Sequence, residues 1–328
     1  MSVTQFVFFR IGGSRPSPAV GIVALTALLV VAFGVQTAGV WLSKDNMTSV
    51  LQATATLGIM ALGEALVITA REIDISVGSV FGIGSLVYLG FAPIAGPLAA
   101  FAGAIFAGAA IGALNGLLVT RFKVSALIAT LGTLFIFRGI CYALTEGFSF
   151  EAGDALMTSR VYTVFGGGEI LGVKNSLLWL VLAAFALHVV MFGTPFGNWL
   201  LAVGGDEQSA LSRGVRTKAV KLVAFVLSGA LAAFAGVLEA SKIGFADGSF
   251  GRLQELQAIA ACVIGGCTLT GGRCSIVGVV FATFMLMGIQ SFLVLNGVEP
   301  QWFMILLGVM IVVAMVTDRA IHRWILLR

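Results

Sequence analysis

Charged residues are scarce in this chain. Only 10% of its 328 residues are Asp, Glu, Lys or Arg, whereas 59% are hydrophobic and the mean hydropathy is +1.06. Soluble domains carry about 25% charged residues, so the composition excludes an ordinary soluble protein. Apolar stretches of about 20 residues recur along the chain, and they predict an all-α polytopic membrane protein.

Residues that serve catalysis and metal binding are also few. The chain has two histidines and four cysteines without CxxC or CxxH spacing. We therefore interpret the cysteines as packing residues and expect no metal site. The motifs HExxH and GxSxG are missing, which argues against an intramembrane enzyme. No GxxxxGK[ST] phosphate loop occurs, so we expect no cofactor on this chain and ATP hydrolysis, if any, on a separate subunit.

Hydropathy predicts about ten membrane spans in a single domain over residues 19–318. Most of them reach the roughly 20 residues that a helix needs to cross a bilayer, whereas the third and the eighth are short or broken. An even number of spans places both ends of the chain on the same side. The predicted spans are 19–41, 49–70, 75–91, 93–119, 126–145, 176–193, 219–242, 254–266, 275–295 and 300–317.

The basic residues predict the orientation. With the N-terminus inside, thirteen Lys and Arg residues fall on the inner side and five on the outer side. This bias predicts that the tails, 1–18 and 319–328, and the loop 194–221 are cytoplasmic. Anionic lipid accounts for the basic pI, so no nucleic-acid partner is needed. Segment 146–175 becomes the main outer loop, and its length favours a docking or lid role over a plain connector.

The loop 194–221 is the only extended polar stretch rich in Arg and Lys. Asp206 is a good N-cap, Glu207 suits the first turn of a helix, and Gly214 is a natural residue after a helix end. The pattern predicts a short helix outside the membrane, shaped to receive a push from a soluble partner. An ordinary cytoplasmic loop is the alternative.

Several polar side chains fall inside predicted spans. Because an intramembrane charge costs several kcal/mol unless it is paired or hydrated, each is a candidate for the transport pathway. The alternative is structural pairing, for example between Glu64 and Arg138. The candidates are Glu64, Asn115, Arg138, Glu239 and Lys242.

Two polar or glycine-rich stretches interrupt the spans, at residues 71–79 and 265–273. Interrupted segments in matching halves of a transporter often mark its binding region, although the internal repeat here is weak. We expect Asp74, Ser76 and Thr268 to lie close to the pore. For Asp74 a capping role at the start of the third span remains the alternative. Hydropathy leaves open whether the two stretches are loops or unwound backbone inside the membrane.

Five motifs follow one another between about residues 50 and 318. Together they resemble the motifs of ribose/xylose/arabinose/galactose-type permeases of bacterial ABC importers. The chain departs from that pattern at Ala70-Arg71-Glu72 and at Glu239. The motifs are Ile73-Asp74-Ile75-Ser76-Val77-Gly78-Ser79, Asn115-Gly116-Leu117-Leu118-Val119, Ala129-Thr130-Leu131-Gly132-Thr133 with Arg138-Gly139, Gly204-Gly205-Asp206-Glu207 through Ser212-Arg213-Gly214, and Leu256-Gln257-Ala258-Ile259-Ala260-Ala261 with Val263-Ile264-Gly265-Gly266 and Gly271-Gly272-Arg273.

The resemblance implies the permease of a type II-like ABC importer that carries a monosaccharide across the bacterial inner membrane. It implies a second permease copy or a sister permease, two ATP-binding subunits that hold ATP and Mg, and a periplasmic sugar-binding protein. In that family the segment around residue 206 contacts the ATPase. The residues expected to couple to it are Gly204, Gly205, Asp206, Glu207, Ser209, Leu211, Arg213 and Gly214.

A second class of transporter stays open. An ion-coupled secondary transporter of a small polar solute would use Glu64, Asp74 or Glu239 as a proton or sodium site. It would need no partner subunit. A neighbouring reading frame with ATP-binding motifs would favour the ABC importer.

Overall fold

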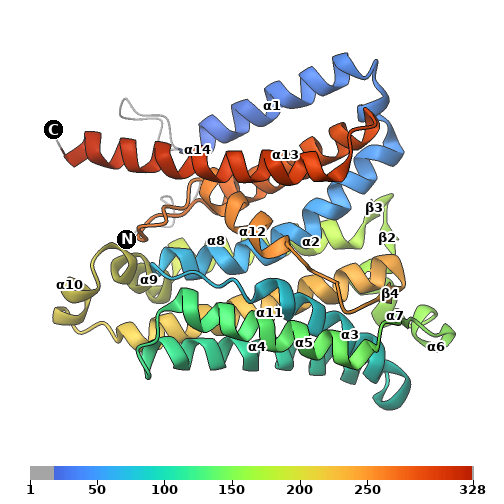
Figure 1. Ribbon diagram of the computed structural model, residues 1–328, viewed down its shortest axis with the longest axis horizontal. Coiled ribbons are helices and arrows are strands. Elements are labelled where there is room, and N and C mark those ends of the chain that lie inside the picture. The colour runs from blue at the N-terminus through green and yellow to red at the C-terminus, as the bar shows by residue number, and fades with distance from the viewer. Residues whose placement is uncertain (1–17, 327–328) are drawn as a thin grey trace.

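The computed structural model describes residues 18–326, and the side chains of residues 20–316. The predicted N-terminal tail, apart from Pro18, lies outside the described residues. Long helices run side by side along the longest dimension of the molecule (Figure 1). They are α1 (Pro18–Gln36), α2 (Lys44–Thr69), α3 (Val77–Ala95), α4 (Pro97–Thr120), α5 (Ala126–Thr145), α8 (Asn175–Gly193), α11 (Thr217–Ile243), α13 (Ile276–Leu295) and α14 (Pro300–Leu326).

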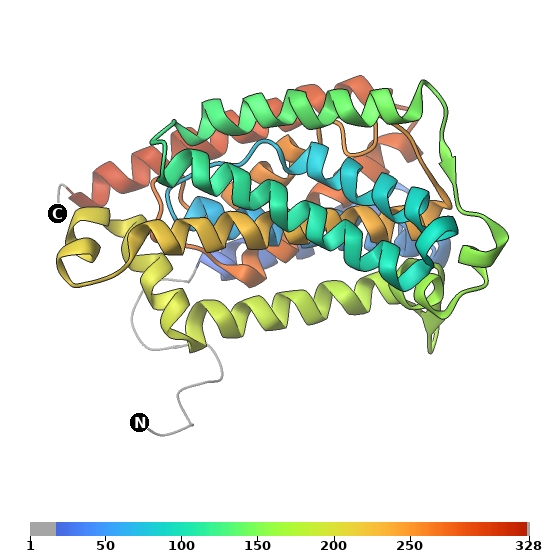
Figure 2. The same ribbon diagram turned by 90° about the horizontal axis from the view of Figure 1, so that it is seen from below.

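Shorter elements gather at the two ends of the bundle, as both ribbon views show (Figures 1 and 2). One end, here the α10 end, carries α9 (Pro195–Gly205) and α10 (Glu207–Ser212). The opposite end, here the loop end, carries most of segment 146–175. Its elements are β1 (Phe150–Glu151), α6 (Asp154–Met157), α7 (Arg160–Tyr162), η3 (Thr163–Gly167), β2 (Glu169–Ile170) and β3 (Val173–Lys174), with β4 (Phe245–Ala246) paired antiparallel to β1.

The all-α membrane architecture predicted from hydropathy is confirmed. Within the described residues, seven helices are long and apolar enough to cross a membrane. Three shorter apolar stretches, Val20–Gln36, Gln254–Ile264 and Pro300–Val316, coincide with the remaining predicted spans. The eighth predicted span is short, as expected, because α12 (Gln254–Ile264) has only 11 residues. The exact number of spans stays a prediction.

The boundary between the third and fourth predicted spans lies further along the chain than expected. The spans 75–91 and 93–119 imply a turn at residue 92, but α3 continues through Pro93 to Ala95. Gly96 then adopts φ 84°, and Pro97 occupies the first turn of α4. Glycine tolerates this left-handed conformation and proline fits the first helical position, so the Gly-Pro pair sets the turn.

Helix α2 forms the centre of the bundle. It packs against α11, α13, α12 and α8. In α2, 83% of the apolar window is buried, against 22% in α8 at the periphery. Small residues allow the helices to approach closely: a side chain on Gly108 would collide with the Gly229 carbonyl, and one on Gly112 with the Phe225 carbonyl.

Two segments without helical structure interrupt the bundle. Residues 70–76 return from the end of α2 to the start of α3, and residues 244–253 return from the end of α11 to the start of α12 (Figure 1). The second segment packs against the first turn of α3, because a side chain on Gly251 would collide with the Gly78 carbonyl. The first matches the predicted interruption at 71–79. The second lies between the predicted spans 219–242 and 254–266, and the other predicted interruption, 265–273, forms a turn after α12.

The short element η2 (Val40–Leu42) joins α1 to α2. Its Trp41 is fully buried and donates from Nε1 to the Gly288 carbonyl at 3.2 Å, which ties this connection to α13. Ser43 then begins α2, because its side chain accepts a hydrogen bond from the Asn46 N–H. The N-terminal helix is thereby attached to the body of the bundle.

Candidate functional site

A buried polar cluster lies at the start of α3. Asp74 Oδ1 accepts hydrogen bonds from the Ser76 N–H at 2.9 Å and from the Ser76 hydroxyl at 2.6 Å. Asn115 of α4 donates from Nδ2 to Ser76 Oγ at 2.8 Å. All three side chains are buried. Asp74 therefore orders the backbone that enters α3 inside the bundle, although the N-cap residue of α3 is Ser76 and, within the described residues, no side chain caps this helix.

The cluster extends to α2 and α5. Glu64 Oε1 accepts a hydrogen bond from the Asp74 N–H at 3.0 Å. Thr133 donates from its hydroxyl to Asn115 Oδ1 at 2.8 Å. Thr130 Oγ1 accepts from the Ile75 N–H at 3.2 Å. Three helices thus hold the segment 70–76 through side chains.

Four predicted pathway residues, Glu64, Asp74, Ser76 and Asn115, meet in this cluster. Thr130 and Thr133 were not predicted as partners, although both lie in the motif Ala129-Thr130-Leu131-Gly132-Thr133. Among the described residues, Glu64 Oε2 and Asp74 Oδ2 accept no hydrogen bond. Within the cluster, these two carboxyl oxygens can still accept a hydrogen bond from a hydroxyl group of a solute. Both side chains are at most 1% exposed, so a solute reaches them only after the bundle opens.

Arg138 does not pair with Glu64, which was the structural alternative considered for both. Its Nη1 donates to the Phe250 carbonyl at 2.6 Å and to the Gly248 carbonyl at 3.2 Å. It thereby holds the segment 244–253 against α5. Backbone carbonyls thus accept from the guanidinium here, in place of a carboxylate.

The other predicted pathway residues lie apart from the cluster. Glu239 and Lys242 form an ion pair at 2.7 Å near the loop end of α11. Thr268 donates from its hydroxyl to the Gly271 carbonyl at 2.9 Å, which tightens the turn after α12. Each of these three residues therefore has a local structural partner.

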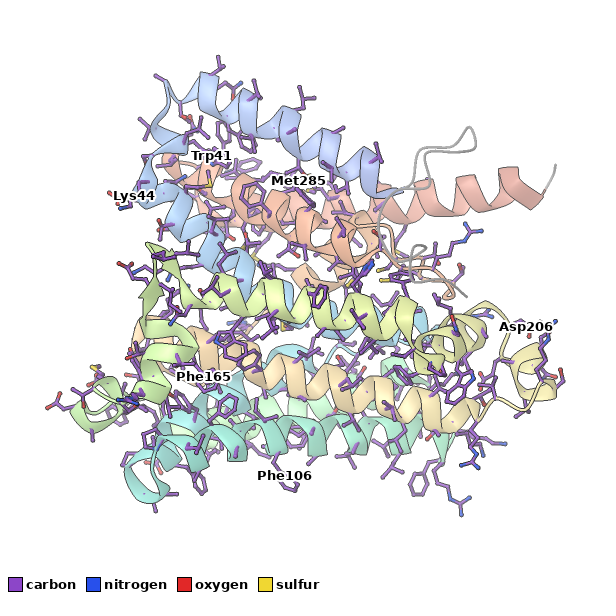
Figure 3. All side chains as sticks on the ribbon, turned by 180° about the vertical axis from the view of Figure 1, so that it is seen from behind. Trp41, Lys44, Phe106, Phe165, Asp206 and Met285 are labelled. Atoms are coloured by element: carbon purple, nitrogen blue, oxygen red, sulfur yellow. The ribbon has the colours of Figure 1, made fainter. Side chains whose placement is uncertain are left out.

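The short helix predicted in the loop 194–221 is present as α10. Asp206 caps α10, because its Oδ1 accepts from the Gln208 N–H at 2.9 Å and from the Ser209 N–H at 3.1 Å. These bonds, with the Ser209 hydroxyl, lower the pKa of Asp206 below its ordinary value. Gly214 follows with φ 83°, as expected for a residue beyond a helix end. Asp206 lies at the tip of the α10 end (Figure 3).

The end of α9 packs without any gap against two other parts of the chain. A side chain on Gly204 would collide with the Thr69 carbonyl at the end of α2 and with the backbone nitrogen of Gly272. The Gly272 N–H also donates to the Thr69 carbonyl at 3.0 Å. Helix α10 is therefore connected through α9 to the end of α2 and to the turn after α12.

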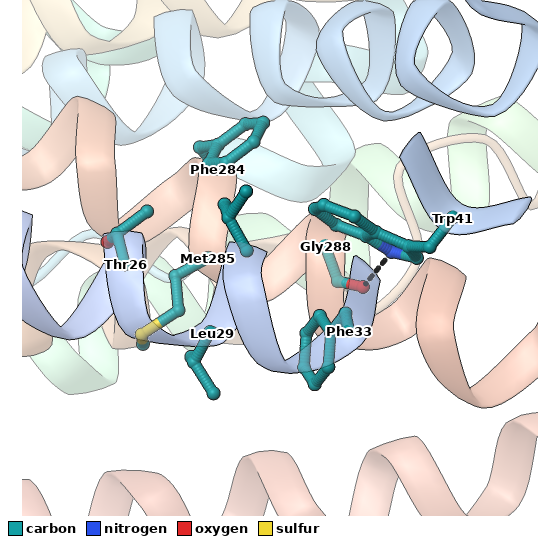
Figure 4. Close-up of a pocket in the computed structure, with 8 residues that line it drawn as sticks. Thr26, Leu29, Phe33, Trp41, Phe284, Met285 and Gly288 are labelled. Carbon is teal, nitrogen blue, oxygen red and sulfur yellow. Dashed lines mark hydrogen bonds between the residues drawn. The ribbon is translucent and has the colours of Figure 1, made fainter. Parts of the chain in front are cut away.

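A small hollow between α1 and α13 is unsuited to a polar solute (Figure 4). Its lining is apolar except for Thr26, whose hydroxyl already donates to the Ile22 carbonyl at 2.7 Å. The described residues also hold no group of three or more His, Cys, Asp or Glu side chains that could bind a metal ion. The residues that line the hollow are Thr26, Leu29, Val30, Phe33, Trp41, Phe284, Met285 and Gly288.

Apolar helices, a polar cluster at an interruption and an exposed capped helix define a multi-pass membrane transport protein. The profile of the family described as branched-chain amino acid transport system / permease component matches residues 46–315. The chain belongs to this family of permease components, and it contributes transport rather than enzymatic chemistry. The resemblance to sugar ABC importer permeases drawn from the five motifs is confirmed.

Individual relatives match most of the chain. It is 37% identical over 281 residues to the autoinducer 2 import system permease protein LsrC of Escherichia coli (strain K12 / DH10B), which covers 85% of this chain and 80% of that protein. It is 35% identical over 281 residues to the ribose import permease protein RbsC of Bacillus subtilis (strain 168), covering 85% of this chain and 86% of that protein. No solved structure matches the chain.

Proposed function

We propose that the chain is the permease subunit of an ATP-driven, binding-protein-dependent importer of a monosaccharide-sized sugar. The observation that carries this proposal is the capped helix α10, exposed at one end of a membrane bundle in a chain without a phosphate loop. Such a helix gives a separate ATP-binding subunit a surface to push. The relatives named for ribose and autoinducer 2 support a sugar-like cargo.

The proposed assembly holds two permease chains, two ATP-binding subunits with ATP and Mg, and a periplasmic binding protein at the loop end. The α10 end and both chain ends face the cytoplasm of a bacterial inner membrane. Leu211 of α10, which is 61% exposed, offers an apolar contact to the ATP-binding subunit. The neighbouring coupling residues Asp206, Ser209 and Gly214 fix the shape of the helix on which it lies.

The proposed pathway passes the cluster around Asp74. Sugar hydroxyls need donors and acceptors, and the free carboxyl oxygens of Glu64 and Asp74 supply acceptors once the segment 70–76 moves. Arg138 and Thr268 shape the path by holding the segment 244–253 and the turn after α12. The Glu239–Lys242 pair lies near the loop end, where the solute enters.

Reconstitution tests the proposal. The chain is purified with its ATP-binding subunits and binding protein and inserted into liposomes, and the uptake of labelled ribose is measured with ATP and Mg on the α10 side. We expect uptake with ATP and none with ADP. Uptake that follows a proton or sodium gradient without ATP would overturn the proposal in favour of a secondary transporter.

The role of Asp74 is tested by Asp74→Asn. Asparagine keeps an acceptor oxygen for the Ser76 N–H but removes the charge. If the charge serves the pathway, we expect normal assembly and about tenfold slower uptake, since a lost charge-assisted contact is worth ~1.5–3 kcal/mol. Native uptake would assign Asp74 to the folding of the segment alone. Ser85→Ala, which removes a buried hydroxyl on α3 outside the cluster, is the matched control.

The orientation is tested by cysteine labelling. Leu171, which is 99% exposed, and Gln208 of α10 are each replaced by cysteine, and intact cells are treated with a membrane-impermeant maleimide. We expect Leu171→Cys to react at once and Gln208→Cys to react only after the membrane is opened. The unsubstituted chain corrects for its four natural thiols. Reversed labelling would contradict the proposed orientation.

A further inference from the structure

Lys221 joins three separate parts of the molecule. It lies one turn into α11, and its Nζ is 2.8 Å from Glu72 Oε1 in the segment 70–76. The same Nζ is 2.7 Å from Glu207 Oε2 in the first turn of α10. One cation therefore connects the exposed helix to the interrupted segment.

The burial of the three side chains makes this connection stronger than a surface contact. The side chains of Lys221 and Glu72 are 12% and 17% exposed, whereas that of Glu207 is 47% exposed. Ion pairs shielded from water are screened less than exposed ones. If one carboxylate is removed, the ammonium group keeps the other but is no longer held between the two elements.

Only one residue, Ile73, separates Glu72 from Asp74 of the buried cluster. The Glu72 N–H donates to the Val67 carbonyl at 3.1 Å, and the chain then runs without helical structure to Asp74. A two-residue extended step spans about 7 Å and contains no helix that absorbs a displacement. A movement of Glu72 therefore reaches the Asp74 N–H, which Glu64 holds, and the Asp74 carboxylate, which orders Ser76.

We propose that Lys221 is a positioning residue that transmits a displacement of α10 to the segment 70–76 and so to the buried cluster. The source of that displacement rests on the proposed function, in which an ATP-binding subunit moves α10. The close contact of Gly204 with Thr69 and Gly272 connects the same end of the molecule to the turn after α12. Lys221 is the ionic connection from α10 to the segment 70–76.

The first test measures ATP-driven uptake in the reconstituted complex. Glu72→Gln and Glu207→Gln each break one arm of the connection. Because the arms act in series, we expect each variant to lower uptake about tenfold and the double variant to lower it no further. Lys221→Arg keeps a cation that can reach both carboxylates, so we expect this variant to retain most of the uptake. Lys218→Met, an exposed cation on the same turn of α11, is the control. Unchanged uptake in either single variant, or independent effects that multiply, would overturn the proposal.

The second test does not depend on transport. Hydrogen exchange in the purified chain reports the amides of Asp74, Ile75 and Ser76, which all donate hydrogen bonds to side chains. We expect Glu207→Gln to raise their exchange several-fold, although Glu207 lies in another element. Glu169→Gln, which breaks an ion pair at the loop end, should leave them unchanged.

Exchange that stays the same in Glu207→Gln overturns the proposal whatever the uptake assay shows. Failure of the wild-type complex to take up sugar with ATP overturns the proposed function instead. In that case the hydrogen exchange still decides whether Lys221 connects α10 to the segment 70–76.

Discussion

The two ends of the molecule are attached to the bundle in different ways. At the α10 end, backbone packs on backbone at Gly204, and Lys221 connects α10 to the segment 70–76. At the loop end, η3 rests on continuous helices through stacked aromatic rings: Phe165 lies 4.0 Å from Phe101 and 5.3 Å from Trp179, between ring centroids. The α10 end is thus attached directly to the segment 70–76 and to the turn after α12, whereas the loop end packs on continuous helices and meets the segment 244–253 through the pairing of β1 with β4.

The largest effect is expected for Gly204→Ala. The added methyl group would collide with the Thr69 carbonyl and the Gly272 nitrogen, and overpacking of this kind costs ~1–3 kcal/mol or more. We expect a lower midpoint of thermal unfolding in detergent and a loss of ATP-driven uptake. Gly205→Ala is the matched control for the unfolding midpoint, because nothing lies within 4 Å of the added group. Equal behaviour of the two variants would remove Gly204 from the connection.

A smaller effect is expected at the loop end for Phe165→Ala. Phe165 is half-buried and stacks on two rings, each contact being worth about 0.5–1.5 kcal/mol. We expect faster proteolysis of the segment 146–175 while ATP hydrolysis by the assembled complex stays unchanged. Phe106→Ala serves as the control, since Phe106 is 75% exposed and points away from the bundle (Figure 3). Altered ATP hydrolysis in Phe165→Ala would mean that the loop end is also coupled to the ATP-binding subunits.

A local effect of pH is expected at α10. The hydrogen bonds to Asp206 lower its pKa, so its carboxylate stabilises α10 at pH values above its ordinary pKa near 4. That stabilisation is lost as the pH falls through the lowered pKa of the folded state. We expect amide protection in α10 to hold from pH 8 to 5 and to fall below pH 4. Asp206→Asn, which caps without titrating, should show no such fall.

The smallest effect is expected for Glu169→Gln. Glu169 and Lys174 are 55% and 33% exposed, and exposed ion pairs contribute ~0–1 kcal/mol. We expect the thermal unfolding midpoint and the uptake to remain within error of the wild type. Glu72→Gln, which breaks the shielded pair with Lys221, provides the contrast. A similar loss in both variants would contradict the difference between the two ends.

Local chemistry explains which parts of this fold the sequence predicts. The helix α10 was predicted because its cap, Asp206, and its terminating glycine, Gly214, act on backbone within a few residues. The membrane spans were predicted from hydropathy, which likewise depends only on residues close together in the sequence. The cluster residues Glu64 and Asn115 were found because a polar side chain in an apolar run stands out.

Contacts distant in sequence were not predicted. Thr130 and Thr133 bond to the carbonyls of their own helix as well as to the cluster, as threonines in membrane helices commonly do, so nothing local marked them. Arg138 was expected beside a carboxylate, but it found carbonyls of the segment 244–253, and carbonyls have no sequence signature. The position of that segment between the predicted spans 219–242 and 254–266 was predicted, but its contact with Arg138 was not.

The most direct test of the difference between the two ends is photocrosslinking in the assembled complex. A benzophenone amino acid replaces Leu211 of α10 in one sample and Leu171 at the loop end in another; both side chains are exposed. We expect the benzophenone at position 211 to crosslink to the ATP-binding subunit and the benzophenone at position 171 to crosslink to the binding protein. A crosslink from position 171 to the ATP-binding subunit, or none from position 211, would contradict this expectation.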